Sequence, residues 1–187
     1  MTIIGAVHTS EGAWIAADSL HVHYQAGYGE AADKIFRFRE QQLAWGWFGS
    51  SDQADVFEAE MGGYQELHTW DDLAYKFENA VNALDRQAGG QRFGVVFAGC
   101  LGGEWAVRTF ARWQLKSAEP DGAALFVGVN RLAASVGWKL TTQIVDQQER
   151  LRLVMQAVID SSPYTLGTPL QLWRITEDYC GPATTGA

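Results

Sequence analysis

The first 38 residues, MTIIGAVHTSEGAWIAADSLHVHYQAGYGEAADKIFRF, contain the strongest signals for both fold and chemistry. Thr2, Asp18 and Lys34 are evenly spaced within them, since each follows the previous one by 16 residues. Removal of Met1 gives Thr2 a free α-amine beside its own hydroxyl group. Because an α-amine has a reference pKa of about 7.7–8.0, it can accept the hydroxyl proton near neutral pH. The trio therefore predicts a threonine nucleophile with a built-in base, oriented by an acid and a cation further along the chain.

The residues around this trio predict two β-hairpins. Residues 2–8 and 13–18 are mostly apolar and flank a turn at residues 9–12. Residues 35–38 and 43–48 flank a second polar turn in the same way. The N-terminal third of the chain is therefore expected to consist of short antiparallel strands.

After Gly49 the spacing of apolar residues changes to three and four, which predicts helices. Thr69 is expected to cap the second of them. The expected helices cover residues 54–61, 70–88, 131–140 and 142–160. Further strands are expected at residues 93–98, 105–110, 123–127 and 170–175, and residues 181–187 are expected to form a loose tail.

This order of elements predicts an α+β fold. Hairpin-connected strands with separate helix pairs favour two antiparallel sheets, each covered by two helices, which gives a four-layer αββα sandwich. The 187 residues are enough for one compact domain with a sizeable core, so residues 1–187 are expected to form a single domain.

Composition excludes several classes of partner. A formal net charge of −8 argues against nucleic acid or an anionic membrane as the main partner. Cys100 and Cys180 are the two cysteines and form no metal motif or disulfide framework, which fits a cytoplasmic location. His21 and His23 could face one side of a strand, but no carboxylate or cysteine motif accompanies them, so no metal and no other cofactor is expected. The sequence shows neither a signal peptide nor an apolar run of about 20 residues, as a membrane helix would need.

Five motifs together resemble one family, the proteasome β-type peptidases. This family includes the bacterial HslV peptidase and related bacterial proteasome homologues, and it belongs to the N-terminal-nucleophile hydrolases. The motifs are TIIG (2–5), GAWIAADS (12–19), KIF (34–36), WGWFGS (45–50) followed by Ala54-Asp55, and FAG (97–99). Residues 2–49 need no gap, and the likeness fades after residue 125. The resemblance implies the four-layer αββα fold that the element order also predicts.

The resemblance also implies a role for each matched residue. Thr2 would be the nucleophile, Lys34 would lower the pKa of its hydroxyl, and Asp18 would orient Lys34. The backbone N–H of Gly49 would stabilise the oxyanion, and Asp160 would lie near the threonine amine.

Two positions depart from the family pattern near that amine. Many relatives have Gly-Ser-Gly where this chain has Gly-Val-Asn at residues 128–130, and Val129 cannot form a hydrogen bond through its side chain. A glycine–serine pair that follows the acid in many relatives is replaced here by Pro163 and its neighbours. Ser162, Thr165 or Asn130 could take the missing serine's place, and activity or its pH optimum could differ.

Family likeness places five residues around the first specificity pocket: His21, Ala32, Phe36, Gly46 and Ser50. Ala32 and Gly46 are small, which leaves room for a large side chain, and Phe36 supplies an apolar wall. We therefore expect a preference for bulky apolar residues.

The sequence therefore predicts a threonine-type endopeptidase subunit that forms stacked homo-oligomeric rings and cleaves unfolded proteins or peptides inside them. An ATPase unfoldase stays open as a further partner. Three alternatives also remain: a small-molecule amidase of the same superfamily, an inactive structural or regulatory ring subunit that retains Met1, and a non-catalytic binding module.

Overall fold

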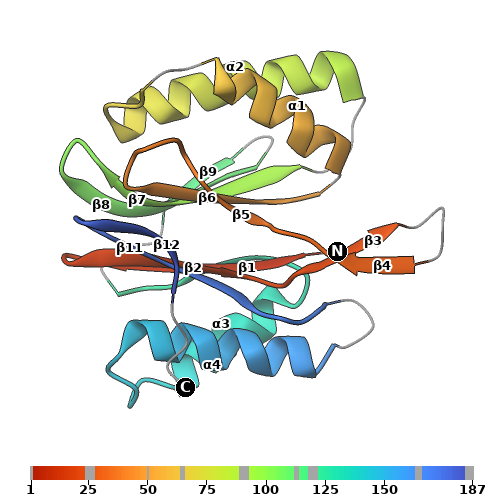
Figure 1. Ribbon diagram of the computed structural model, residues 1–187. Helices are drawn as coiled ribbons and strands as arrows, with labels where there is room; N and C mark the ends of the chain where they lie inside the picture. Colours follow the sequence, from red (N-terminus) through yellow and green to blue (C-terminus); the bar gives the residue numbers. More distant parts are fainter. Residues whose placement is uncertain are drawn as a thin grey trace.

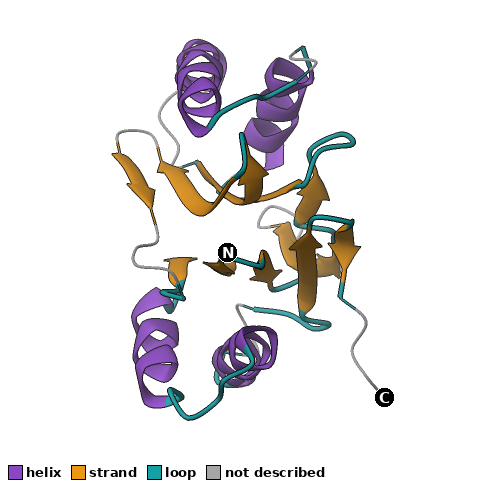
Figure 2. Ribbon diagram, turned by 90° about the vertical axis from the view of Figure 1, so that its left-hand side faces the viewer, coloured by secondary structure: helices purple, strands orange, loops and turns teal. Residues whose placement is uncertain are grey.

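The computed structural model describes residues 2–23, 28–49, 51–63, 66–88, 93–111, 114–117, 122–162 and 166–183. Its elements stack in four layers, with a pair of helices outside each of two central sheets (Figure 1). The view from the side shows the same order of helices, sheet, sheet and helices (Figure 2). The chain therefore has an α+β fold with two antiparallel five-stranded sheets and four helices in its described part, as the sequence predicted.

One sheet contains the N-terminal strands, in the order β10-β1-β2-β11-β12. The strands are β1 (Ile3–Thr9), β2 (Gly12–Ala17), β10 (Leu125–Gly128), β11 (Gln171–Thr176) and β12 (Tyr179–Pro182). Strand β1 is buried on both faces: Ile3 packs toward the helices and Ile4 toward the second sheet. The two covered faces explain why residues 3–7 of β1 are all apolar instead of alternating with polar ones.

The second sheet has the order β5-β6-β7-β8-β9. Its strands are β5 (Ile35–Arg37), β6 (Leu43–Phe48), β7 (Gly94–Leu101), β8 (Glu104–Ala111) and β9 (Gln114–Ser117). Val95 and Phe97 of β7 pack toward the helices, whereas Val96 and Ala98 pack toward the first sheet. A separate two-stranded sheet joins β3 (Leu20–His23) to β4 (Tyr28–Ala31).

Two helix pairs cover the outer faces of the sheets (Figure 1). They are α1 (Ser51–Gly62) and α2 (Trp70–Ala88) on the second sheet, and α3 (Arg131–Leu140) and α4 (Gln147–Asp160) on the first. Thr69 caps α2 as predicted, since its hydroxyl accepts a hydrogen bond from the Asp72 amide at 3.0 Å. The prediction that the last helix starts at residue 142 was wrong. Asp146 accepts a hydrogen bond from the Glu149 amide at 3.1 Å and caps α4 there.

The chain end also differs from the prediction. Gly181 and Pro182, expected in a loose tail, lie in β12, which pairs with β11. Because β12 is an edge strand, Pro182 can lie in it although it has no N–H to donate. Ala183 continues the pairing, because its amide donates to the Leu172 carbonyl at 2.7 Å. Residues 184–187 lie outside the described residues.

Candidate active site

The antiparallel pairing of β1 and β2 brings Asp18 beside the start of the chain. Ile4 pairs with Ala17, so Asp18 lies opposite Ile3. The Asp18 amide donates to the Ile3 carbonyl at 3.3 Å, and the Ile3 amide donates to Asp18 Oδ1 at 3.0 Å. Ile3 and Asp18, which are 15 residues apart in the sequence, are therefore in direct contact.

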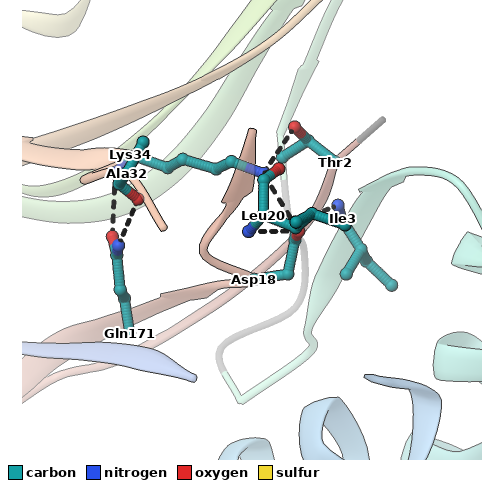
Figure 3. Close-up of polar contacts among 7 residues, drawn as sticks. All are labelled: Thr2, Ile3, Asp18, Leu20, Ala32, Lys34 and Gln171. Atoms are coloured by element: carbon teal, nitrogen blue, oxygen red, sulfur yellow. Dashed lines mark hydrogen bonds and ion pairs between the residues drawn. The ribbon is translucent and has the colours of Figure 1, made fainter. Parts of the chain in front are cut away.

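Lys34 lies just before β5 and extends its side chain toward Thr2 (Figure 3). Its Nζ atom donates to Thr2 Oγ at 3.1 Å, to Asp18 Oδ2 at 3.0 Å and to the Leu20 carbonyl at 2.6 Å. An ammonium group has three N–H donors, and each has an acceptor here. The structure therefore brings together the three residues whose even spacing marked the sequence.

This cluster is buried. The exposed fractions are 6% for Thr2, 2% for Lys34 and 0% for Asp18. Burial lowers the pKa of Lys34, because removal from water disfavours the ammonium form, and the nearby Asp18 carboxylate opposes that effect. A positive charge beside Thr2 Oγ would in turn stabilise the alkoxide that a nucleophilic threonine must form.

The Thr2 backbone is held by the end of β10 and the residue that follows it. The Val129 amide donates to the Thr2 carbonyl at 3.0 Å. Gly128, directly before it, has φ of 94°, and a Cβ atom at this position would overlap the Thr2 carbonyl. Only glycine permits this close approach without strain. Although the Val129 side chain cannot bond to the threonine amine, its backbone fixes the residue that carries the amine.

Gly49, expected to supply the oxyanion hole, follows β6 and is exposed. Its φ of 128° lies in the region that side chains rarely adopt, so the residue type fits the backbone. Whether its N–H binds an oxyanion stays a prediction.

Asp160, expected near the threonine amine, is the last residue of α4 and is exposed. Its Oδ1 atom accepts a hydrogen bond from Gln156 of the same helix at 2.7 Å. Asn130 and Ser162, two of the proposed substitutes, bond to each other, with Asn130 Nδ2 donating to Ser162 Oγ at 2.6 Å. Pro163 and Thr165 lie outside the described residues.

The expected pocket residues have varied surroundings. Phe36 packs against Trp45 with ring centroids 5.2 Å apart and ring planes tilted by 35°, and it lines a cavity of about 560 Å³. Gly46 leaves no free space, because a Cβ atom there would lie 2.9 Å from the Lys34 carbonyl oxygen and 3.3 Å from an Ile4 methyl group. The room expected at Gly46 is thus filled by the protein itself.

For the other three expected pocket residues, Ala32, His21 and Ser50, the structure describes only part of the surroundings or none. Ala32 is half-buried, and its amide donates to the Ser19 carbonyl at 2.8 Å. His21 pairs with Glu30 through the β3–β4 backbone, but its side chain lies outside what the structure describes. Ser50 lies outside the described residues altogether.

Sequence reasoning missed several residues that build the site. Leu20 supplies a backbone acceptor for Lys34, and the Leu20 amide donates to Asp18 Oδ2 at 3.2 Å. Gly167 packs against Leu20, because a Cβ atom there would lie 2.5 Å from the Leu20 Cβ. Gln171 bonds to the backbone on either side of Asp33. Backbone acceptors and a single glutamine carry no sequence pattern that could have identified them.

The described residues contain no cluster of three or more histidine, cysteine, aspartate or glutamate side chains suited to a metal ion. None of the described helices combines the length and the apolar character needed to cross a membrane.

Solved structures share this architecture. The chain superposes on Anbu (ancestral beta-subunit) from Yersinia bercovieri with a TM-score of 0.79 and 13% identity, covering 98% of this chain and 87% of that one. An Anbu (Gly-1) mutant from Hyphomicrobium sp. strain MC1 gives 0.81 and 14%, covering 98% and 85%. Eukaryotic HslV from Trypanosoma brucei gives 0.71 and 13%, covering 95% and 100%. No protein-family model and no curated protein matches the sequence.

These likenesses establish the fold. Two antiparallel sheets between two helix pairs, superposed over nearly the whole chain, form the proteasome-type N-terminal-nucleophile hydrolase fold. At 13–14% identity the comparison does not extend to activity, so function must be argued from the site itself.

Proposed function

We propose that this chain, which has the proteasome-type N-terminal-nucleophile hydrolase fold, is a threonine-type endopeptidase subunit. One observation carries the proposal: the buried Lys34 ammonium donates to Thr2 Oγ at 3.1 Å while Asp18 holds it at 3.0 Å. A surface ion pair would be solvated and would contribute about 0–1 kcal/mol. Desolvating an ammonium group beside a hydroxyl group instead suits activation of that hydroxyl as a nucleophile.

The proposed reaction begins with removal of Met1, which frees the Thr2 α-amine. The amine takes the proton from Thr2 Oγ, and the oxygen attacks the carbonyl carbon of a peptide bond. Lys34 stabilises the developing negative charge on Oγ, and the Gly49 N–H stabilises the charge on the former carbonyl oxygen.

The C–N bond then breaks. The leaving nitrogen takes the proton held by the α-amine, and the acyl group stays on Thr2 as an ester. Water attacks this ester with the α-amine again as base, releasing the second product and restoring Thr2. Asp160 accepts a hydrogen bond from Gln156 in this structure, and its expected place near the threonine amine stays a prediction.

The subunit is further proposed to act as a single domain within a cytoplasmic homo-oligomer of stacked rings. Its substrates would be peptides or unfolded proteins, which can reach an enclosed site as extended chains. The fold shared with the Anbu and HslV structures supports this assembly.

The test is the intact mass of the protein after incubation with a peptide epoxyketone, a warhead that reacts with both the hydroxyl group and the free α-amine of an N-terminal threonine. Loss of Met1 with gain of one inhibitor mass is the expected result, and Thr2→Ala should gain none. Retained Met1 without an adduct would refute the peptidase and favour the structural ring subunit. Lost Met1 without an adduct would indicate a latent site and direct attention to Val129.

A further inference from the structure

Gln171 connects the two sheets beside the Thr2 site. It is the first residue of β11 and pairs with Ala17, directly before Asp18. Its side chain leaves this sheet and reaches the chain segment that enters β5 (Figure 3). Nε2 donates to the Ala32 carbonyl at 2.7 Å, and Oε1 accepts from the Lys34 amide at 2.8 Å.

These two bonds imitate the pairing of a neighbouring strand. A backbone amide can only donate and a carbonyl can only accept, so the partners fix which way the glutamine amide faces. The same segment is held elsewhere too. The Ala32 amide donates to the Ser19 carbonyl at 2.8 Å, and the Lys34 carbonyl packs against Gly46.

The attachment of the Lys34 backbone to Gln171 affects the site because the side-chain end of Lys34 contacts Thr2. Its Nζ atom must meet Thr2, Asp18 and Leu20 at once, at 3.1, 3.0 and 2.6 Å. A shift of the Lys34 backbone would move Nζ away from the position that suits all three acceptors, and a misplacement of about 1 Å can cost 10²-fold in rate.

We propose that Gln171 is a positioning residue for Lys34: its amide fixes the backbone of residues 32–34 so that the ammonium group reaches Thr2. The catalytic part of this inference rests on the proposed function, whereas the effect on Lys34 does not.

Removal of this amide should leave the protein folded. Gln171 is half-buried and lines the cavity of about 560 Å³, together with Asp33 and Phe36. Because the cavity adjoins Asp33, which lies between the two backbone groups, we expect water to replace the lost hydrogen bonds when the glutamine is replaced. Gln171→Met keeps the length and apolar stem of the side chain and removes both hydrogen bonds.

The chain contains a matched control. Gln41 makes the same kind of two-bond bridge elsewhere, with Nε2 donating to the Leu67 carbonyl at 2.7 Å and Oε1 accepting from the Leu67 amide at 3.1 Å. Gln41→Met therefore removes an equivalent bridge that has no contact with Lys34, and any general loss of stability should appear in both variants.

The first experiment measures hydrolysis of a fluorogenic peptide by the assembled protein. Gln171→Met should lower kcat by about 10–100-fold, with a much smaller change in KM, because the proposed role of Gln171 acts on Lys34 and not on the substrate. Gln41→Met should stay within about twofold of the wild type. An equal kcat for both variants would overturn the proposal.

The pH dependence of kcat in Gln171→Glu tests the two hydrogen bonds of residue 171 more directly. An ionised glutamate accepts from the Lys34 amide but repels the Ala32 carbonyl, whereas a protonated one donates to that carbonyl as glutamine does. The ratio of mutant to wild-type kcat should therefore rise as the pH falls from about 8 to about 5. A constant ratio would contradict the assigned role.

An activity-independent measurement separates this inference from the proposed function. NMR titration of the Lys34 side chain reports its surroundings even in a Thr2→Ala background. In Gln171→Met the Lys34 titration should move up toward that of an ordinary lysine, because a released ammonium group becomes hydrated, and in Gln41→Met it should not move. If the wild-type protein cleaves nothing, an unmoved titration in Gln171→Met still refutes the positioning role, and a moved one supports it.

Discussion

Asp18 Oδ2 and Lys34 Nζ lie 3.0 Å apart, with the two side chains 0% and 2% exposed. The pair lies at the end of the two sheets where β1 begins, and it joins the first sheet to the segment that enters the second. Desolvation of two charges is costly, and their attraction offsets it only when the geometry is good and the remaining polar atoms are bonded. Asp18 meets that condition through the Ile3 and Leu20 amides. The pair therefore keeps the positive charge of Lys34 at a fixed position beside Thr2.

Lys34→Met should remove activity and also destabilise the fold. It leaves the Asp18 carboxylate buried without its cation, which typically costs about 3–5 kcal/mol. Urea denaturation of the variant and the wild type measures this loss. Lys76→Met is the matched control, because Lys76 Nζ also lies 3.0 Å from its partner Asp72, but in a pair whose side chains are 18% and 27% exposed. There water can solvate the carboxylate that remains, so the loss should be smaller, about 1 kcal/mol. Equal losses for the two variants would mean that the Asp18–Lys34 pair is solvated.

The pH dependence of stability should carry the signature of Lys34. Burial places its folded pKa below the ordinary value of 10.5, so between those two values the unfolded chain binds more protons than the folded one. The free energy of unfolding should therefore rise with pH across that interval, and this contribution should be lost as the pH falls through the folded pKa. The difference between wild type and Lys34→Met, followed by urea denaturation from about pH 7 to 11, isolates it. A difference that falls as the pH rises would contradict the lowered pKa.

Gly128→Ala should disturb Thr2 directly. A Cβ atom at Gly128 overlaps the Thr2 carbonyl, and φ of 94° strains any other residue. Gly103→Ala is the control, because Gly103 has φ of 82° but open space around its Cβ position. Backbone strain of about 1–3 kcal/mol applies to both, so Gly128→Ala should lose more stability in urea. It alone should also react more slowly with the epoxyketone. Equal behaviour of the two variants would show that β10 does not fix Thr2.

The sequence predicted the layers and the trio for identifiable reasons. Burial on both faces makes β7 apolar throughout, and the spacing of apolar residues distinguishes the helices from the strands. Thr2, Asp18 and Lys34 could be found because a reactive group needs particular side chains. The groups that bind these side chains in place could not be predicted, because the Leu20 carbonyl and the Val129 amide are backbone groups without a sequence signal.

Other misses have similar physical causes. Gly46 was expected to leave space because glycine is small, yet whether space remains depends on the Lys34 carbonyl across the strand pair. The hydrogen bond of Asp160 to Gln156 could not be predicted either, because it depends on where α4 ends, and the expected place of Asp160 near the threonine amine stays a prediction. Strand β12 was missed because glycine and proline disfavour strands, although both are accepted at a sheet edge.

The reactivity of Cys180 reports whether strand β12 is packed against the protein. It lies in β12 and packs against the core between the sheets. Burial raises the pKa of its thiol to about 11, and nearby Arg37 opposes this only in part. Since only the thiolate reacts, iodoacetamide at about pH 8 should label Cys180 on the order of 100-fold more slowly in the folded protein than in urea.

The Cys100→Ala variant leaves Cys180 as the one cysteine to be labelled, so intact mass can follow the reaction. As the pH rises from 8 toward 10, the rate in the folded protein should keep increasing, because the thiolate fraction grows roughly tenfold per pH unit below the pKa. A labelling rate at pH 8 equal to that of the unfolded chain would show that the thiol is solvated and that β12 is not packed. The chain end would then be loose, as the sequence predicted for residues 181–187. The slow rate is the result that the pairing of β11 with β12 requires.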